Sequence, residues 1–169
     1  YYGVSIALKH KGRVEYGVVY NPINQELFTA TRGRGAHMNN QRLRVSPNSK
    51  SLEGALIGTG FPVRNHALLP RYLQMFSAIF TQNVAGVRRA GAATLDLANV
   101  AAGRLDGFWE MELHEWDIAA GALLIKEAGG LIGDFNGGEN YCQSGNVVTG
   151  NPKLFKHLLQ TIHPFVEGE

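Results

Sequence analysis

A pair of carboxylates near residue 110 is the first candidate for chemistry. Glu110 and Glu112 follow the aromatic pair Phe108-Trp109, and the two-residue period of a strand directs both carboxylates to the same side. Neighbouring carboxylates can carry out acid–base catalysis or hold the hydroxyl groups of a sugar. A solvent-facing strand end would account for the same pattern, so the residues alone leave both interpretations open.

Asp117 is the second candidate, because a strongly helical segment begins there. Its carboxylate can accept hydrogen bonds from the free backbone N–H groups of the first turn, as helix caps commonly do. The small residues Ala119, Ala120 and Gly121 would let another element approach that turn closely. A carboxylate fixed in this position could also bind a hard cation, which prefers oxygen ligands.

The third candidate is the turn Arg88-Arg89-Ala90-Gly91-Ala92-Ala93, which joins an expected strand to an expected helix. Free N–H groups at a helix start, together with adjacent guanidinium groups, could bind an anion or a polyol. An ordinary strand-to-helix turn with solvated arginines would explain the same residues.

These candidates must be positioned by two kinds of element. Residues 1–65 are typical of antiparallel structure, with strands expected over 4–8, 14–20, 26–31, 42–45 and 55–58. Helical periodicity then predicts helices over 68–80, 92–102 and 117–128 and from Pro152 onward. Strands expected over 84–88, 105–111, 131–134 and 146–149 alternate with them. This order predicts a layered α/β protein with a mixed sheet.

The composition narrows the class of protein. The 169 residues are 44% hydrophobic, and 16 basic against 14 acidic residues give a net charge of +2, too small to indicate nucleic acid or an acidic membrane as a partner. No apolar run approaches the length of a membrane span. The single cysteine, Cys142, excludes an internal disulfide framework and favours a cytoplasmic location.

The segment Trp116–Gly130, WDIAAGALLIKEAGG, resembles the C-terminal signature of the inositol monophosphatase family. Further matches follow in family order: Val4-Ser5-Ile6-Ala7, ELFTATRGRGA (26–36), TGFP (59–62), RRAGAATLDLANVAAGRLDGFWE (88–110) and TGNP (149–152). The resemblance covers nearly the whole chain, and the bacterial SuhB-like enzymes are its closest branch.

The resemblance implies a layered α/β/α/β/α sandwich. Residues 1–65 would be the remainder of an N-terminal antiparallel-sheet layer, and residues 66–169 a C-terminal α/β layer. The implied activity is Mg²⁺-dependent hydrolysis of a phosphate monoester, inositol monophosphate, in which metal ions activate water and neutralise charge on the phosphoryl group. A homodimer is also implied.

Site residues can be carried over by position. Asp117 matches a catalytic, metal-binding aspartate at a helix start. The residues that match substrate-binding positions are Glu110, Arg88, Gly91, Ala92 and Ala93. Glu110 would hold hydroxyl groups of the substrate, and the Gly91–Ala93 backbone would line the polyol.

Other metal ligands of the family are missing from this sequence. The family also uses an upstream glutamate and an Asp-Pro-Ile/Leu-Asp-Gly-Thr motif, whereas Asp96, Asp106 and Asp134 are not followed by proline. In the family that motif precedes the strand that begins here at Tyr1. The resemblance therefore predicts a fragment that lacks about the first third of the enzyme, is truncated at its N-terminus and is inactive alone.

Two alternatives to this function stay open. SuhB-like proteins are associated with RNA polymerase and ribosomal RNA transcription, a binding role that need not require catalysis. Within the enzyme class, histidinol phosphate, a bisphosphorylated nucleotide or fructose bisphosphate could replace inositol monophosphate as the substrate.

Overall fold

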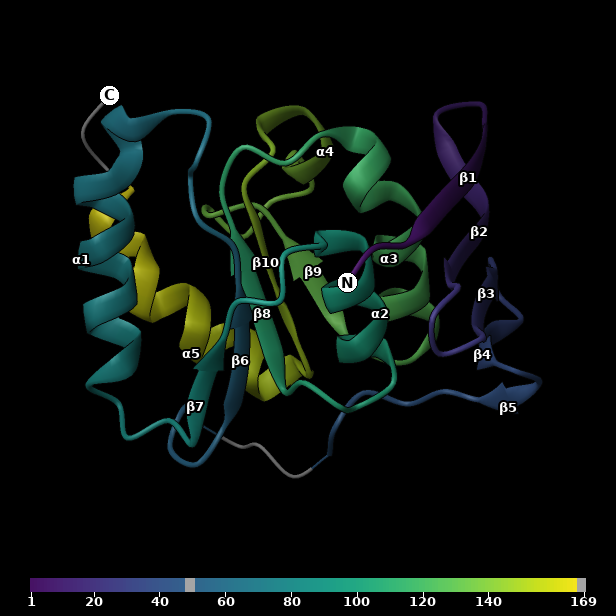
Figure 1. Cartoon of the computed structure of the whole chain (residues 1–169), viewed down its shortest axis with the longest axis horizontal. Helices are drawn as coiled ribbons and strands as arrows, with labels where there is room; N and C mark the ends of the chain where they lie inside the picture. Colours follow the sequence, from purple (N-terminus) through teal and green to yellow (C-terminus); the bar gives the residue numbers. More distant parts are fainter. Residues whose placement is uncertain (48–50, 167–169) are drawn as a thin grey trace.

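Two five-stranded sheets organise the computed structural model, which describes residues 1–47 and 51–166 (Figure 1). The first sheet is an antiparallel meander in chain order, made of β1 (Val4–His10), β2 (Arg13–Asn21), β3 (Glu26–Thr31), β4 (Gly35–Met38) and β5 (Gln41–Arg42). The strands alternate in burial, so that Val19, Phe28 and Ala30 are buried on the inner face.

The second sheet is mixed and has the order β7-β6-β8-β10-β9. Its strands are β6 (Leu56–Thr59), β7 (Gly86–Arg88), β8 (Gly107–Glu110), β9 (Leu131–Gly133) and β10 (Val147–Gly150). Strand β6 runs parallel to both β7 and β8, whereas β10 is antiparallel to β8 and β9. The boundary expected after residue 65 does not separate the sheets, because β6 already belongs to the second one.

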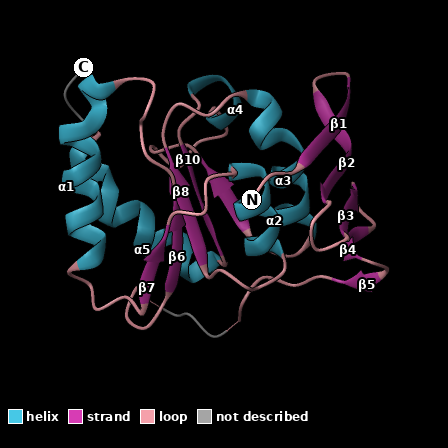
Figure 2. Cartoon of the chain, in the orientation of Figure 1, coloured by secondary structure: helices cyan, strands magenta, loops and turns pink. Residues whose placement is uncertain are grey.

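The helices form two layers (Figure 2). Helices α2 (Ala93–Ala101) and α3 (Glu115–Glu127) lie between the sheets, whereas α1 (Leu69–Phe80) and α5 (Pro152–Ile162) pack together beyond the second sheet. The remaining pieces are the one-turn α4 (Tyr141–Ser144) and the short 3₁₀ helices η1 (His66–Leu68) and η2 (His163–Phe165). The observed sequence of layers, β/α/β/α, confirms the predicted α/β sandwich.

Small residues set the close packing of the middle layer. A Cβ on Gly17 of β2 would lie 3.0 Å from the Ala120 carbonyl oxygen, and one on Gly121 would lie 2.6 Å from the Leu97 Cβ on α2. Side chains at these glycines would push α3 away from both neighbours, which explains the run of small residues at the start of this helix.

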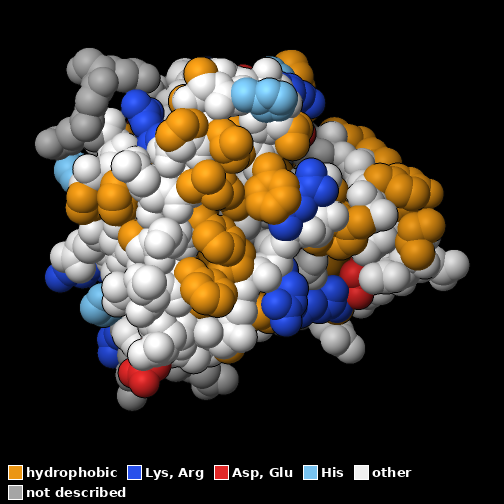
Figure 3. Space-filling model, turned by 60° about the vertical axis from the view of Figure 1, so that its left-hand side comes forward, with side chains coloured by type: hydrophobic (Ala, Val, Ile, Leu, Met, Phe, Trp, Pro, Cys, Tyr) orange, Lys and Arg blue, Asp and Glu red, His pale blue; other side chains and the backbone are white. Residues whose placement is uncertain are grey.

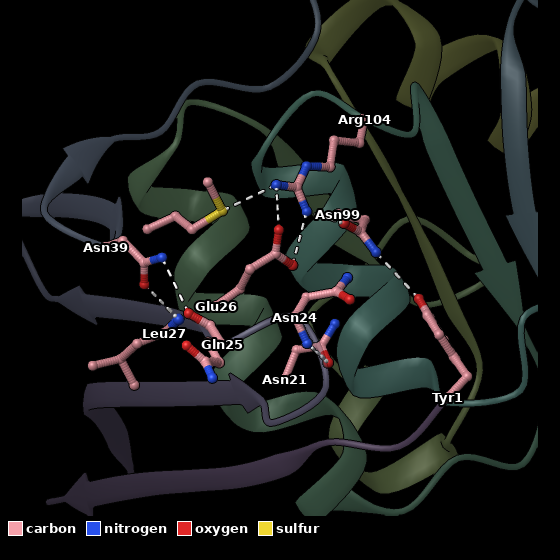
Figure 4. A network of polar contacts seen from close by, with 10 residues as sticks. Tyr1, Asn21, Asn24, Gln25, Glu26, Leu27, Asn39, Asn99 and Arg104 are labelled. Atoms are coloured by element: carbon pink, nitrogen blue, oxygen red, sulfur yellow. Dashed lines mark hydrogen bonds and ion pairs between the residues drawn. The ribbon is translucent and has the colours of Figure 1, made fainter.

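A polar network fastens the first sheet to α2 (Figure 4). Arg104, just after α2, makes a two-bonded ion pair with Glu26 of β3 at 2.7 and 3.0 Å. The Tyr1 hydroxyl accepts a hydrogen bond from Asn99 at 3.1 Å and donates one to the buried Asp96 carboxylate at 3.0 Å. The first residue of the chain is therefore held against the helix whose start borders the candidate site.

The outer face of the first sheet is uncovered in the part of the chain that the structure describes. Val4, Ile6 and Leu8 on β1 are between 50% and 62% exposed, and Tyr16 and Leu27 extend the same surface. We call these five residues the outer sheet face. Apolar patches of this kind commonly mark an interaction surface.

Several expected elements differ from the observed ones. The strand predicted over 42–45 is confined to β5, and β4 and α4 were not predicted at all. None of the described helices is long and apolar enough to cross a membrane.

Candidate active site

A pocket of about 200 Å³ lies at the edge of the second sheet. Because β6 and β8 are parallel neighbours, their carboxyl ends open at the same edge, where open α/β sheets commonly bind ligands. The first turns of α2 and α3 complete the walls. The lining residues are 59–64, Arg89, Gly91, Ala92, Ala93, 110–113 and Asp117.

Glu110 lies at the centre of this group because the residue facing it has no side chain. A Cβ on Gly60 would overlap the Glu110 carboxylate. Burial, and then the negative charges of Asp96 and Asp117, raise the pKa of Glu110 to about 8, although Arg89 and Arg64 oppose the shift. The Glu110 carboxyl group is therefore mostly protonated near neutral pH and can donate as well as accept a hydrogen bond.

This raised pKa predicts that the protein loses stability as pH rises. The unfolded chain releases the Glu110 proton near pH 4.5, whereas the folded chain retains it up to about pH 8. Between these values the native state binds more protons, so the free energy of unfolding falls with increasing pH. We expect denaturant titrations of residues 1–169 to show this decline. Burial also raises the pKa of Asp96 to about 6, so Glu110→Gln should remove mainly the part of the decline between about pH 6 and pH 8. An equally steep decline in the variant would contradict the assignment.

The Asp117 side chain is held in place by a hydrogen bond at the N-terminus of its own helix, α3. Helix α3 begins at Glu115, so Asp117 is the third helical residue and not the cap expected from the sequence. One of its carboxylate oxygens, Oδ2, accepts the backbone N–H of His114 at 3.1 Å, while its own N–H donates to the His114 carbonyl oxygen at 2.9 Å. This reciprocal pairing fixes the carboxylate at the pocket wall.

Only some of the predicted substrate-binding residues line the pocket. Gly91, Ala92 and Ala93 line the pocket, with Gly91 at a φ of +103°. Arg88 is exposed outside the lining, and its guanidinium donates to the Val87 carbonyl oxygen at 3.2 Å. Its neighbour Arg89 lines the pocket instead. The role predicted for Arg88 stays a prediction.

Sequence reasoning included Arg89 in the candidate turn 88–93 but named only Arg88 as the substrate-binding arginine, and it did not assign Gly60 or the loop that follows β6 to the site. The Arg89 guanidinium carbon lies 5.4 Å from the centroid of the Phe61 ring, a cation–π distance. The sequence shows that residue 89 is an arginine. Because strand β7 ends at residue 88, the alternation of side chains between the two faces of a strand does not predict the direction of the Arg89 side chain.

The loop after β6 is fastened to the segment between β8 and α3. Arg64 Nη1 lies 2.9 Å from His114 Nε2, and because arginine only donates, that histidine nitrogen is the acceptor. The Asn65 amide donates to the Glu112 carboxylate at 2.9 Å, and Glu112 has a left-handed φ of +57°. These two contacts close one wall of the pocket.

The pocket meets only part of the requirement for a metal site. Asp117 offers the hard oxygen donor that Mg²⁺ prefers. Within residues 1–47 and 51–166, however, no three His, Cys, Asp or Glu side chains converge closely enough to hold a metal ion. The described residues therefore do not by themselves form a complete metal site.

A layered α/β sandwich of this kind is shared with the solved inositol monophosphatase of Anabaena, which gives a TM-score of 0.83 at 33% identity, covering 96% of this chain and 66% of that one. The chain belongs to the inositol monophosphatase family, whose model matches residues 1–167.

The particular relatives are SuhB proteins and inositol monophosphatases. The chain is 59% identical over 166 residues to the Nus factor SuhB of Pseudomonas aeruginosa, covering 97% of this chain and 60% of that protein. It superposes with a TM-score of 0.91 on the extragenic suppressor protein SuhB of Bartonella henselae, at 45% identity, covering 96% of this chain and 61% of that one. A staphylococcal IMPase-II with inositol monophosphate bound gives a TM-score of 0.85 at 25% identity, covering 98% and 63%. The chain thus spans about three-fifths of the length of these relatives.

Proposed function

We propose that residues 1–169 form the substrate-recognising part of a Mg²⁺-dependent phosphate monoester hydrolase that acts in the cytoplasm on a phosphorylated polyol, inositol monophosphate being the first candidate. The observation that carries this proposal is the meeting of Asp117, Glu110 and Arg89 around one pocket. The bound inositol monophosphate in the staphylococcal relative supports the substrate class.

Each of these side chains has a distinct task in the proposal. Asp117 is one ligand of Mg²⁺, which supplies Lewis-acid activation and charge neutralisation when bound. Glu110 exchanges hydrogen bonds with substrate hydroxyls, and the backbone of Gly91, Ala92 and Ala93 borders the ring. Arg89, and Arg88 if it turns inward, contributes positive charge beside an anionic substrate.

The remaining metal ligands would come from a segment outside residues 1–169. We define the extended chain as residues 1–169 joined to the part of the Pseudomonas relative that residues 1–169 do not match. The close identity of the two proteins makes this chimera suitable for testing the activity.

Glu110→Gln in the extended chain should change substrate preference. Glutamine retains the size of the side chain but changes its donor and acceptor pattern, so alcohols whose hydroxyls contact Glu110 should lose about 1–3 kcal/mol of transition-state stabilisation. The measurement is kcat/KM for inositol monophosphate, histidinol phosphate, a bisphosphorylated nucleotide and fructose bisphosphate. Glu53→Gln, at an exposed residue outside the pocket, is the matched control. A uniform loss for all four substrates would refute the specificity role.

A second candidate function is association with the transcription machinery, which the Nus-factor names of the relatives favour. Leu69, Leu73 and Phe80 of α1 are exposed, and so is Phe61, whose ring centroid lies 5.6 Å from that of Tyr72 on the same helix. Apolar side chains gather on the face of the molecule that Figure 3 shows. We call these four residues the α1 face. A homodimer would bury such a face, and an RNA polymerase subunit is the competing occupant.

A further inference from the structure

A second cavity, of about 220 Å³, shares no residue with the candidate active site. It lies between the turn of the β1–β2 hairpin, one face of α3 and the start of α4. We call it the hairpin cavity. Neither the proposed hydrolysis nor any predicted site residue uses it.

The floor of the hairpin cavity is apolar and built from small side chains. Ala119, Ala122 and Leu123 are only 6%, 4% and 2% exposed, and helical spacing puts them on one face of α3. Val14 closes the floor on the hairpin side. The volume is below the range usual for drug-sized ligands, so the cavity suits one compact apolar group.

The rim carries an excess of positive charge. Four basic residues line it, against two carboxylates, those of Glu115 and Glu139. Lys9 pairs with Glu115 at 2.6 Å and Lys126 pairs with Glu139 at 3.2 Å, so these four charges largely cancel.

The two other basic residues on the rim are Arg32 and Arg13, and they differ in whether they have partners within the described part of the protein. Arg32 Nη2 and Nε donate to the Val14 carbonyl oxygen at 2.6 and 3.0 Å, and its Nε also lies 3.4 Å from Glu15. The Arg13 side chain, which is exposed at the hairpin turn, has no hydrogen-bond or ion-pair partner among residues 1–47 and 51–166. Arg13 lines the same cavity as the apolar floor, and a guanidinium group without a protein partner suits a planar anion, which it can bind through two parallel hydrogen bonds.

We propose that the hairpin cavity binds a carboxylate attached to a compact apolar body, with the apolar body on the Ala119–Leu123 floor and the carboxylate paired with Arg13. Two sources share this chemistry: the C-terminal residue of a peptide and a free N-acylated amino acid. A neutral ligand of the same shape would contact the apolar floor but would make no charge-assisted hydrogen bond with Arg13.

N-acetyl-leucine is the probe, and N-acetyl-leucinamide is its matched neutral analogue. Calorimetric titration of residues 1–169 should show saturable binding of the acid and binding about ten-fold weaker, or none, for the amide, because a charge-assisted hydrogen bond is lost. Arg13→Glu and Arg13→Gln should abolish the preference for the acid. Lys11→Glu makes the same charge change at the tip of the same hairpin, outside the cavity lining, and should leave binding within about two-fold.

Cys142 gives a readout specific to this cavity. It is the only cysteine in the sequence, it is half-buried, and it lines the cavity. Burial raises the pKa of its thiol, so alkylation is followed at alkaline pH, where enough thiolate forms. N-acetyl-leucine should slow alkylation of Cys142 in the wild-type chain and in Lys11→Glu, but not in Arg13→Glu.

A short peptide ending in leucine separates the two sources. Tighter binding of the peptide than of N-acetyl-leucine, lost on C-terminal amidation, identifies a protein C-terminus, whereas equal binding identifies a free acyl amino acid. Either result supports the site. Equal binding of acid and amide, an unchanged affinity in Arg13→Glu, or binding without protection of Cys142 would overturn the proposal.

Discussion

Asp117→Asn in the extended chain is expected to lower turnover by orders of magnitude without unfolding the protein. Loss of one charged ligand from a metal clamp removes several kcal/mol of transition-state stabilisation. Asparagine retains an oxygen that can accept the His114 N–H, so the start of α3 should persist. Turnover of inositol monophosphate with Mg²⁺, measured beside circular dichroism, tests the expectation.

Glu115→Gln is the control for this variant, because it removes the same charge from the same helix turn outside the pocket. Near-wild-type turnover in Asp117→Asn would exclude Asp117 as a ligand. Capture of RNA polymerase by the Asp117→Asn protein would separate the binding function from catalysis, since the α1 face is unchanged in it.

Residues 1–169 alone should hydrolyse inositol monophosphate at a negligible rate, whereas the extended chain should be active. A clamp of two metal ions needs several oxygen ligands within a few Å of one another, and among the described residues no three His, Cys, Asp or Glu side chains converge in this way. Mg²⁺ gives up its water reluctantly, so one carboxylate binds it weakly. Hydrolysis by residues 1–169 at an ordinary enzyme rate would show that unrecognised ligands exist within them.

The outer sheet face allows a second measurement on residues 1–169, which is their state of association. Its apolar side chains should make residues 1–169 self-associate, because burial of exposed apolar surface is favourable. Sedimentation velocity of residues 1–169, compared with Ile6→Ser, measures this tendency. A strictly monomeric wild-type chain would contradict this expectation and would show that the outer sheet face does not cause self-association.

The sequence predicted the long elements of the fold well and the short ones poorly. The apolar run over 4–8, the enrichment in Val and Tyr over 14–20 and the helical spacing over 68–80 are strong local signals, and the glycine pair at 129–130 marks the end of α3. The observed elements agree with these signals within a few residues. Strand β4, with the sequence Gly-Ala-His-Met, lacks β-branched residues, so its pairing with β3 and β5, and not its local sequence, makes it a strand. The single turn of α4 is likewise too short to leave a periodic signal.

The candidate site was foreseen through residue types and missed where tertiary contacts decide. Glu110 and Asp117 could be selected because carboxylates at a strand end and a helix start are chemically informative. Arg89 lines the pocket with its guanidinium over the ring of Phe61, a residue on another loop, and no local pattern predicts that contact. The Arg64–His114 contact joins residues 50 positions apart, which no local pattern reports.

The absence of a side chain at Gly60 limits how this pocket can be redesigned. Any residue larger than glycine at position 60 would require the Glu110 carboxylate to move, so a mutagenesis library at that position would displace the proposed substrate-binding group itself. Phe61, Val63 and Arg64 border the same space from an exposed loop. A directed-evolution experiment should therefore diversify those three positions and leave Gly60 fixed.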